Sequence, residues 1–376
     1  MKLKIKSDKT NSDKNTAGAK SLPLFSKIAY ISAAVCALLF IIFIVSETFS
    51  DFFNRHIASV LRAALAYITG WIPFSLSEML VILIPVITVF TVIFAMRHYA
   101  DSWHDVFVFC GILLSIAAIF FSVFTLGFAS AYRGSTLDKK LRIERADVSA
   151  EELYETSMIL ARELNREKSR IVFIEHGFSV MPYGYGEMND KLIEAYDTAC
   201  EKYDFIQKLN SNLKPVMLSE PMSYTHITGV YTFFTGEANI NVAFPDYTIP
   251  YTAAHELAHQ RGIAREDEAN FVAFLVCMES NDPYIRYSAY LNLYEYVSSA
   301  LYSASPELYK AVNSTLDINI RYEMKSYSDF FKKYQNSVAS EVTEAVNDTF
   351  LTIQGTEGTK SYGMVVDLAV AYYNGR

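Results

Sequence analysis

The sequence has few cysteines and lacks the short motifs that mark several common classes of protein. Four cysteines occur among 376 residues, and none forms a Cys-x-x-Cys pair or a Cys–His zinc spacing. This absence argues against a structural zinc module. No glycine-rich phosphate loop, nucleophile elbow or internal repeat occurs, which argues against a P-loop nucleotide site, an α/β-hydrolase and a solenoid.

Positive charge is scarce outside the N-terminus. The chain has 33 Lys and Arg against 41 Asp and Glu, a net charge of −8. Seven of the lysines lie in residues 1–27, where the acidic residues are Asp8 and Asp13. Residues 133–376 are therefore strongly acidic, which argues against nucleic acid as a partner.

Hydrophobic residues, in contrast, are abundant: they make up 51% of the chain and are concentrated in its first third. Three runs, 28–46, 79–96 and 106–132, carry no charge. Each is long enough to cross a hydrocarbon layer about 30 Å thick as a helix. The runs predict three transmembrane helices and the lipid bilayer as a partner. The alternative for the second and shortest run is a buried core helix.

The residues flanking these runs predict the topology. Residues 45–49 offer no convincing cleavage site, so the first run is predicted to be a signal anchor, not a cleaved signal peptide. Residues 1–27, lysine-rich and polar, are predicted to be a disordered cytoplasmic tail. Three crossings within 28–132 then place 133–376 outside the cell. We therefore predict a multi-pass cell-membrane protein with an extracellular C-terminal domain.

The segment between the first two runs, residues 49–73, has an apolar stripe at helical spacing. Two interpretations are open. It could be an amphipathic helix in the outer membrane interface, with Tyr67 and Trp71 as aromatic anchors. It could equally be an ordinary helix packed on the extracellular domain.

The most specific motif is His255-Glu-Leu-Ala-His259, an HExxH run followed by Gly262. Residues four apart share one face of a helix, so the two imidazoles can bind one metal ion. Two histidines, a carboxylate and a water suit Zn²⁺, and Glu256 could act as the general base on that water. The alternative is an amphipathic helix with two exposed histidines. Gly262 stands where such a helix would end.

The third metal ligand is expected from the acidic stretch that follows. Glu266 and Glu268 are both candidates. Glu266 is preferred because it shares a helix face with Asn270, which could support a ligand through a hydrogen bond. Glu268 points away from Asn270 and is the second candidate.

The stretch 255–271, with Thr235-Gly-Glu-Ala-Asn239 upstream, resembles a family of uncharacterised bacterial membrane proteins, domain of unknown function 3810. The resemblance covers nearly the whole chain. That family has no established activity, so it implies a zincin-like peptidase only through the motif.

The run Glu266-Asp-Glu-Ala-Asn270 also resembles the second ligand helix of ImmA/IrrE-type and heat-shock membrane metalloproteases. This likeness implies Glu266 as a zinc ligand. The gap from His259 to Glu266 is shorter than is usual in gluzincins. The Gly262 turn is similar to that of metzincins, but their third histidine would fall at Arg265, so the clan stays open.

The remaining patterns of residues 133–376 predict an α+β fold: a mostly helical, zincin-like domain with a small β-sheet. Helical spacing or capping signals stand in seven segments, and strand-like residues in three. The helices are expected at 149–166, 192–206, 264–278, 282–297, 306–313, 327–352 and 363–373, and the strands at 215–218, 229–234 and 238–244. The first of these helices is predicted to begin with a capping box formed by Ser149 and Glu152.

Two further predictions concern the site's surroundings. Residues 237–242, with Asn239 and Asn241 on one side, are predicted to be a free edge strand that pairs with an extended peptide substrate; the alternative is an ordinary sheet strand. Tyr287 is the preferred group for stabilising an oxyanion, and Arg286 and His226 are alternatives.

The cysteines leave one question open. Cys36 and Cys110 fall in apolar runs, where they are expected to be packing residues. Cys200 and Cys277 fall on predicted helices of the outer domain, and a disulfide between them is one possibility. The other is that Cys277 is a small buried residue behind the metal site.

Together these patterns predict a membrane-anchored zinc metallopeptidase that hydrolyses peptide bonds of extracellular or cell-envelope proteins or peptides. The alternative is a non-catalytic sensor or scaffold of the cell envelope with a zincin fold. An intramembrane protease is disfavoured, because Thr252, Gln260 and Arg261 flank the HExxH run and no long apolar segment surrounds it.

Overall fold

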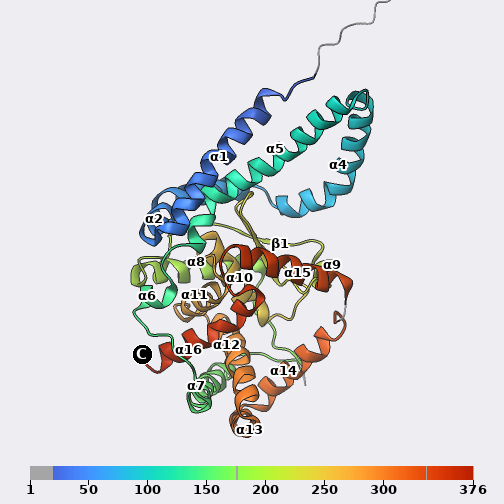
Figure 1. Ribbon diagram of the computed structural model, residues 1–376. Coiled ribbons are helices and arrows are strands. Elements are labelled where there is room, and N and C mark those ends of the chain that lie inside the picture. The colour runs from blue at the N-terminus through green and yellow to red at the C-terminus, as the bar shows by residue number, and fades with distance from the viewer. Residues whose placement is uncertain (1–19, 175–176, 336, 376) are drawn as a thin grey trace, which may run out of the picture.

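The computed structural model describes residues 20–174, 177–335 and 337–375 (Figure 1). Most of the predicted disordered tail, 1–27, lies outside the described residues. For the last residues of this tail the prediction is wrong, because the first helix already begins at Leu24. The chain is mostly helical, with one small sheet. In Figure 1 three long helices project from one end of a compact helical domain.

Those three helices are long and apolar enough to cross a membrane, with mean hydropathies of 2.9, 2.8 and 2.7. They are α1 (Leu24–Val45), α4 (Leu76–His98) and α5 (Trp103–Gly127). None of the residues of α4 is buried, so the alternative that it is a core helix is wrong. The uncharged run predicted a start at residue 106, but α5 begins three residues earlier, at Trp103. Ser102 Oγ caps the helix there by accepting a 3.2 Å bond from the N–H of Asp105.

The first and third of these helices pack together through small polar side chains. Ser26 Oγ lies 3.0 Å from Ser115 Oγ, and Ser32 Oγ donates to Ser122 Oγ at 3.1 Å. Such pairs satisfy hydroxyl groups between apolar helices and hold their register. After α5 the chain turns through a short 3-10 helix, η2 (Ala129–Tyr132). The third predicted span extended through these residues, so it was predicted too long at its C-terminal end.

The segment between α1 and α4 is helical in three pieces: α2 (Glu47–Phe53), a π-helical turn η1 (Asn54–Ala58) and α3 (Ser59–Gly70). The interpretation as a helix packed on the C-terminal domain is confirmed, and the interpretation as a helix in the membrane interface stays a prediction. The polar face of the segment packs on the domain that follows α5, called the outer domain here after its predicted position. Gln207 Nε2 and Lys214 Nζ of that domain donate 3.1 Å bonds to the carbonyls of Ser59 and Thr69. Its apolar face is exposed, with Trp71 at the end of α3 90% accessible.

The outer domain is built around the buried helices α10 and α11. Helices α8, α12 and α16 pack on them, and α7 packs on the outer side of this layer against α12, α13 and α16. The capping box predicted at Ser149 and Glu152 is confirmed at the start of α7. The helices are α6 (Leu137–Leu141), α7 (Ala150–Lys168), α8 (Tyr185–Lys202), α9 (Ser219–Ser223), α10 (Thr248–Gln260), α11 (Glu266–Met278), α12 (Pro283–Ala304), α13 (Pro306–Thr315), α14 (Ile318–Phe331), α15 (Val338–Ile353), η3 (Gly358–Met364) and α16 (Val365–Tyr373).

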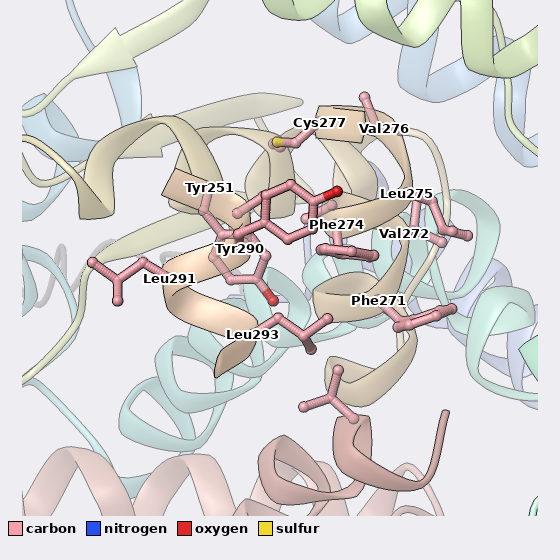
Figure 2. Packing of buried hydrophobic residues seen from close by; sticks show 14 of the residues in the cluster. Tyr251, Phe271, Val272, Phe274, Leu275, Val276, Cys277, Tyr290, Leu291 and Leu293 are labelled. Atoms are coloured by element: carbon pink, nitrogen blue, oxygen red, sulfur yellow. The ribbon is translucent and has the colours of Figure 1, made fainter. Parts of the chain in front are cut away.

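Figure 2 shows the core between α10, α11 and α12, where aromatic and aliphatic side chains interlock. Phe271 and Phe274 stack one turn apart, and Phe274 meets Tyr290 edge to face. Cys277 is buried in this core as a free thiol, and Cys200 is also free, so the two form no disulfide. This core holds α10, which carries the HExxH run, and α11, which begins with the acidic stretch, in fixed positions.

Three strands form the sheet: β1 (Leu213–Pro215), β2 (Gly229–Thr232) and β3 (Glu237–Ile240). Their order is β1-β3-β2, with β3 parallel to β1 and antiparallel to β2. The prediction that residues 237–242 form a free edge is therefore wrong. Strand β3 is hydrogen-bonded on both sides, and β2 lies at the side of the sheet.

One helix expected over 327–352 is two. The chain leaves α14 at Phe331 and starts again at α15, where Ser337 Oγ accepts a 2.9 Å bond from the N–H of Ser340. A serine cap gives the backbone an alternative to continuing one helix. The break lets α15 run in its own direction (Figure 1).

Candidate metal centre

The HExxH run lies in α10, which is almost entirely buried. His255 and His259, one turn apart, face the same side, and their ring centroids are 4.5 Å apart. The helix ends in a left-handed residue, Gly262, at φ +86°. The N–H of Gly262 donates to His259 O at 2.9 Å and that of Ile263 to Ala258 O at 3.1 Å, the bonding pattern of a glycine-terminated helix. The turn brings α11 back against the histidines.

Three ligand-type atoms converge at this turn. His255 Nε2 lies 2.9 Å from His259 Nε2, and Glu266 Oε2 lies 3.2 Å and 3.4 Å from the same two nitrogens. Ligands about 2.0–2.1 Å from a tetrahedral ion would stand roughly 3.3 Å from one another. The three side chains are all buried and could hold a metal ion.

The surrounding hydrogen bonds orient the two histidines. His259 Nδ1 donates to the carbonyl of Ile263 at 2.7 Å, so in the neutral ring Nε2 keeps its lone pair for the site. Asn270 lines the same cavity as His255 and Tyr296, and its side chain contributes to the electrostatics of the His255 ring. Asn270 therefore lies where the sequence placed it, beside a candidate ligand.

Several buried polar atoms at this point have no hydrogen-bond partner among the described residues. They are His255 Nδ1, Glu256 Oε2, Glu266 Oε2 and Asn270 Nδ2. Buried polar groups without partners are costly, and a native structure normally pairs them with water, an ion or a ligand. Two of them, Glu266 Oε2 and Glu256 Oε2, together with the Nε2 atoms of the two histidines, fit a divalent metal ion and its water.

The electrostatics of the triad favour charge separation. Burial raises the pKa of Glu266, but the imidazole of His259 and the close approach of both histidines outweigh it and hold that pKa well below its usual range. Burial likewise opposes protonation of His259, yet the Glu266 carboxylate raises its pKa to about 9. A cation bound between these groups would take the place of that proton.

Glu268, the second candidate for the third ligand, is buried elsewhere. Its Oε1 accepts 2.9 Å bonds from the N–H of Leu137 and from Arg265 Nη1. It holds the start of α6 against α11 and does not belong to the triad. The structure thus places Glu266 beside the histidines and gives Glu268 a packing role.

Glu256, the predicted general base, is 4% exposed. It lines a cavity of about 750 Å³ together with His255 and Asn270. Burial raises the pKa of Glu256 to about 8, although its carboxylate accepts a hydrogen bond from the backbone of Tyr231. Strand β2 passes so close that a Cβ at Gly229 would lie 2.6 Å from Glu256 Oε1, so only glycine fits there.

Of the oxyanion candidates, the structure brings only His226 to the cavity. Its ring Nε2 lies 2.9 Å from the carbonyl of Tyr334. Tyr287 is wrong for this role: it is fully buried and donates to the Glu323 carboxylate, away from the cavity lining. Arg286 pairs with Glu167 at 3.1 Å and is also elsewhere.

Asn239 and Asn241 hold the sheet together and do not face a substrate. Asn239 Nδ2 donates to Val230 O at 3.1 Å, and Asn241 Nδ2 donates to Ile227 O at 3.1 Å. The side chains are buried because β3 is the central strand. Alternation of residue types could not distinguish a central strand from an edge strand.

Sequence reasoning missed two groups of the cavity wall, Glu295 and Tyr296 of α12. They follow one another in a helix rich in tyrosine, so no motif marks them. No motif marks the close approach of Gly229 to Glu256 either, so it was also missed. A short strand beginning at a glycine was its one local signal.

A family model described as "Protein of unknown function (DUF3810)" matches residues 53–370. No curated protein and no solved structure matches the chain at a significant level. The match begins in α2 and ends in α16, so it takes in the site, α4, α5 and nearly all of the outer domain.

Proposed function

The chain belongs to this DUF3810 family of unknown function, and we propose from its site that it is a membrane-anchored, zinc-dependent metallopeptidase. The observation that carries the proposal is the position of Glu256. Its carboxylate lines the same cavity as His255. His255 belongs to the triad of ligand-type atoms formed by its own Nε2, His259 Nε2 and Glu266 Oε2. A purely structural metal site has no need of an additional buried carboxylate beside it.

Each residue then has a distinct role. His255, His259 and Glu266 would hold the ion, which supplies a Lewis acid and lowers the pKa of a bound water. Glu256 would accept a proton from that water at its carboxylate and give it to the leaving amine. A zincin-like peptidase of this kind is the function that the donor set and the general base support best.

Two groups in the cavity wall are suited to stabilise the oxyanion. His226 and Tyr296 both line the cavity, and each carries a group that can donate a hydrogen bond. They replace Tyr287 in this proposal. The substrate strand also moves, from β3 to β2, because β2 lies at the side of the sheet and passes Glu256.

The substrates we propose are extracellular or cell-envelope proteins or peptides. The lysine-rich residues 1–27 favour a cytoplasmic N-terminus, and three crossings then put the cavity outside. A non-catalytic sensor or scaffold with a zincin fold is the remaining candidate. It would use the triad and leave Glu256 without a function.

Glu256→Gln separates the two functions. In the full-length protein purified in detergent, zinc content should equal that of the wild type, because Glu256 is not a ligand. Hydrolysis of a mixed peptide library, followed by mass spectrometry, should fall by two or more orders of magnitude, the range typical of a lost general base.

The control is His255→Ala with His259→Ala, which should abolish zinc binding as well as hydrolysis. Equal zinc content in the wild type and this double variant would contradict the metal site. Zinc-dependent cleavage that survives Glu256→Gln unchanged would contradict the peptidase mechanism.

A further inference from the structure

Helix α15 exposes an apolar face. Val338, Val342, Val346 and Ile353 are 76%, 58%, 66% and 65% accessible. At about 100° per residue these four positions fall within one arc of the helix, roughly 80° wide. A contiguous apolar surface of this kind marks a site of contact with another apolar body.

The opposite face of α15 lines the cavity that holds Glu256 with the polar residues Ser340, Thr343, Glu344 and Asn347. Ser340 is buried there, as is Leu351, while Thr343 and Asn347 are half-buried and Glu344 is exposed. Most of the apolar residues of α15 are thus exposed, the reverse of a helix on the surface of a soluble domain, which buries its apolar side. Helix α15 forms one wall of the metal cavity and keeps its apolar side outside.

A second helix has the same arrangement. In α3, Ser59, Arg62 and Thr69 are buried, whereas Val60 and Ile68 are exposed. This helix lies in the sequence between α1 and α4, two of the three helices that are long and apolar enough to cross a membrane, and it contacts the third, α5. Exposed apolar faces of this kind therefore occur beside the apolar spans.

The apolar side of α15 is continuous with the membrane-type helices, the name used here for α1, α4 and α5. Phe350, near its C-terminal end, packs edge to face on Phe124 of α5 with ring centroids 5.9 Å apart, and on Tyr132 at 6.1 Å. Figure 1 shows α15 lying across the end of the outer domain from which α4 and α5 project.

We propose that α15 is an interfacial helix that lies in the surface of the bilayer with its apolar arc and separates the lipid from the metal cavity with its polar face. The partner is the lipid bilayer. Glu341, Glu344 and Asp348 give the helix negative charge, and it has no Lys or Arg. Burial of apolar side chains, and not attraction to anionic headgroups, therefore holds it there.

The helix does not need basic residues because it is tethered. It belongs to a domain that α1, α4 and α5 hold at the membrane, so its effective concentration at the lipid surface is high. If the proposed peptidase is correct, the cavity has one wall at the membrane surface, and segments close to the bilayer are its substrate class.

The test places a single tryptophan on α15 in the full chain. Trp71→Phe and Trp103→Phe remove both native tryptophans, and Val342→Trp adds one on the apolar arc. The matched control is Glu341→Trp, one position away and about 100° around the helix. Both proteins are reconstituted in phosphatidylcholine vesicles with or without brominated acyl chains.

Bromine should remove most of the emission of Val342→Trp and little of that of Glu341→Trp, and aqueous iodide should do the reverse. Iodide quenching of Val342→Trp equal to that of the control would overturn the proposal. Protection of Val342→Trp from both quenchers would overturn it too, because a protein surface would then cover the helix.

Val338→Trp is a second, independent probe at the most exposed position of the arc, and the same pattern is required of it. Neither fluorescence measurement depends on zinc or on hydrolysis. Failure of the lipid contact is thus distinguishable from failure of the proposed peptidase.

Discussion

Two acidic residues of α11, two positions apart, meet different partners because they point about 200° apart around the helix. Glu266 Oε2 lies 3.2 Å from His255 Nε2, on the side of α10. Glu268 Oε1 accepts bonds from Arg265 and from the backbone of Leu137, on the side of α6. One carboxylate is available to a metal, and the other neutralises a cation and caps a backbone group.

Glu266→Gln and Glu268→Gln are matched changes that should separate these roles. Glu266→Gln removes an anionic ligand, so zinc content should fall far below one per chain. Glu268→Gln should keep the zinc and lower the free energy of unfolding by about 1–3 kcal/mol, because Arg265 loses its charged partner. Metal analysis and thermal unfolding in detergent measure both effects. Loss of zinc from Glu268→Gln alone would reassign the ligand.

Glu295, in the cavity wall, makes stability depend on pH. Burial raises its pKa from 4.5 to about 8, although the hydroxyl of Tyr247 donates to it. Between these values the folded state holds a proton that the unfolded state has released. Its contribution to stability is therefore complete below pH 4.5 and is lost as pH rises to about 8.

Glu295→Gln stays neutral at every pH, so its stability relative to the wild type should rise between pH 5 and pH 8. The slope should be at most about 1.4 kcal/mol per pH unit. Thermal unfolding of both proteins in one buffer series measures the difference. A difference that is constant across this range would show that the carboxyl is ionised in the folded state.

At the scale of elements, the site depends on how α10 ends. Gly262 at φ +86° reverses the chain so that the first turn of α11 meets the second histidine. A Cβ there would lie 2.3 Å from Arg62 Nη2 and 2.8 Å from Asn54 Oδ1. Asn54 Nδ2 also donates to Gly262 O at 3.0 Å. The turn between α10 and α11 is thus bonded to the segment between α1 and α4.

Gly262→Ala should lower both stability and zinc affinity. A left-handed backbone costs a non-glycine residue about 1–2 kcal/mol, and the contact with Arg62 adds to it. A domain of this size loses roughly 2–4 °C of melting temperature per kcal/mol. The control is Gly186→Ala in α8, where a Cβ meets nothing within 4 Å and which should be neutral or slightly stabilising. Equal melting temperatures for the two variants would contradict the argument.

At the scale of the molecule, the membrane-type helices and the outer domain are joined by polar contacts. The carboxylate of Glu237, in β3, caps α4 by accepting 3.0 Å bonds from the N–H groups of Leu76 and Ser77. Arg62 Nη1 donates to Gly127 O, at the end of α5, at 2.8 Å. Buried charged groups with fixed partners hold the cavity at a set distance from the spans.

The proposed topology predicts the behaviour of reporter fusions. A reporter that works only in the cytoplasm, fused after Arg376, should be silent, and a periplasmic or extracellular reporter at the same point should be active. The proposal rests on the lysine-rich residues 1–27, which favour a cytoplasmic N-terminus, and on the three helices that are apolar enough to cross a membrane. The same reporters fused after Asp101, between α4 and α5, should give the opposite result. A strong cytoplasmic signal after Arg376 would place the cavity inside the cell.

Local spacing determined much of this protein. The uncharged runs predicted α1, α4 and α5, because a helix that meets lipid must be apolar along its whole length. The spacing of His255 and His259 and the position of Gly262 predicted a helix with both rings on one face and an end just after it. These features depend on residues within one or two turns of each other, so the sequence alone contains them.

Other features depend on which elements meet, and only the tertiary structure decided them. The crossing of α10 and α11 selects Glu266 over Glu268, which the chain places two residues apart. The strand order puts β3 in the centre of the sheet and buries Asn239, although its alternation is the same as that of an edge strand. The polar face of α15 lines the cavity, and Phe350 beside its apolar face packs on α5, because of where α15 lies in the tertiary structure. Periodicity reports that a helix or strand has two faces, and only packing decides what each face meets.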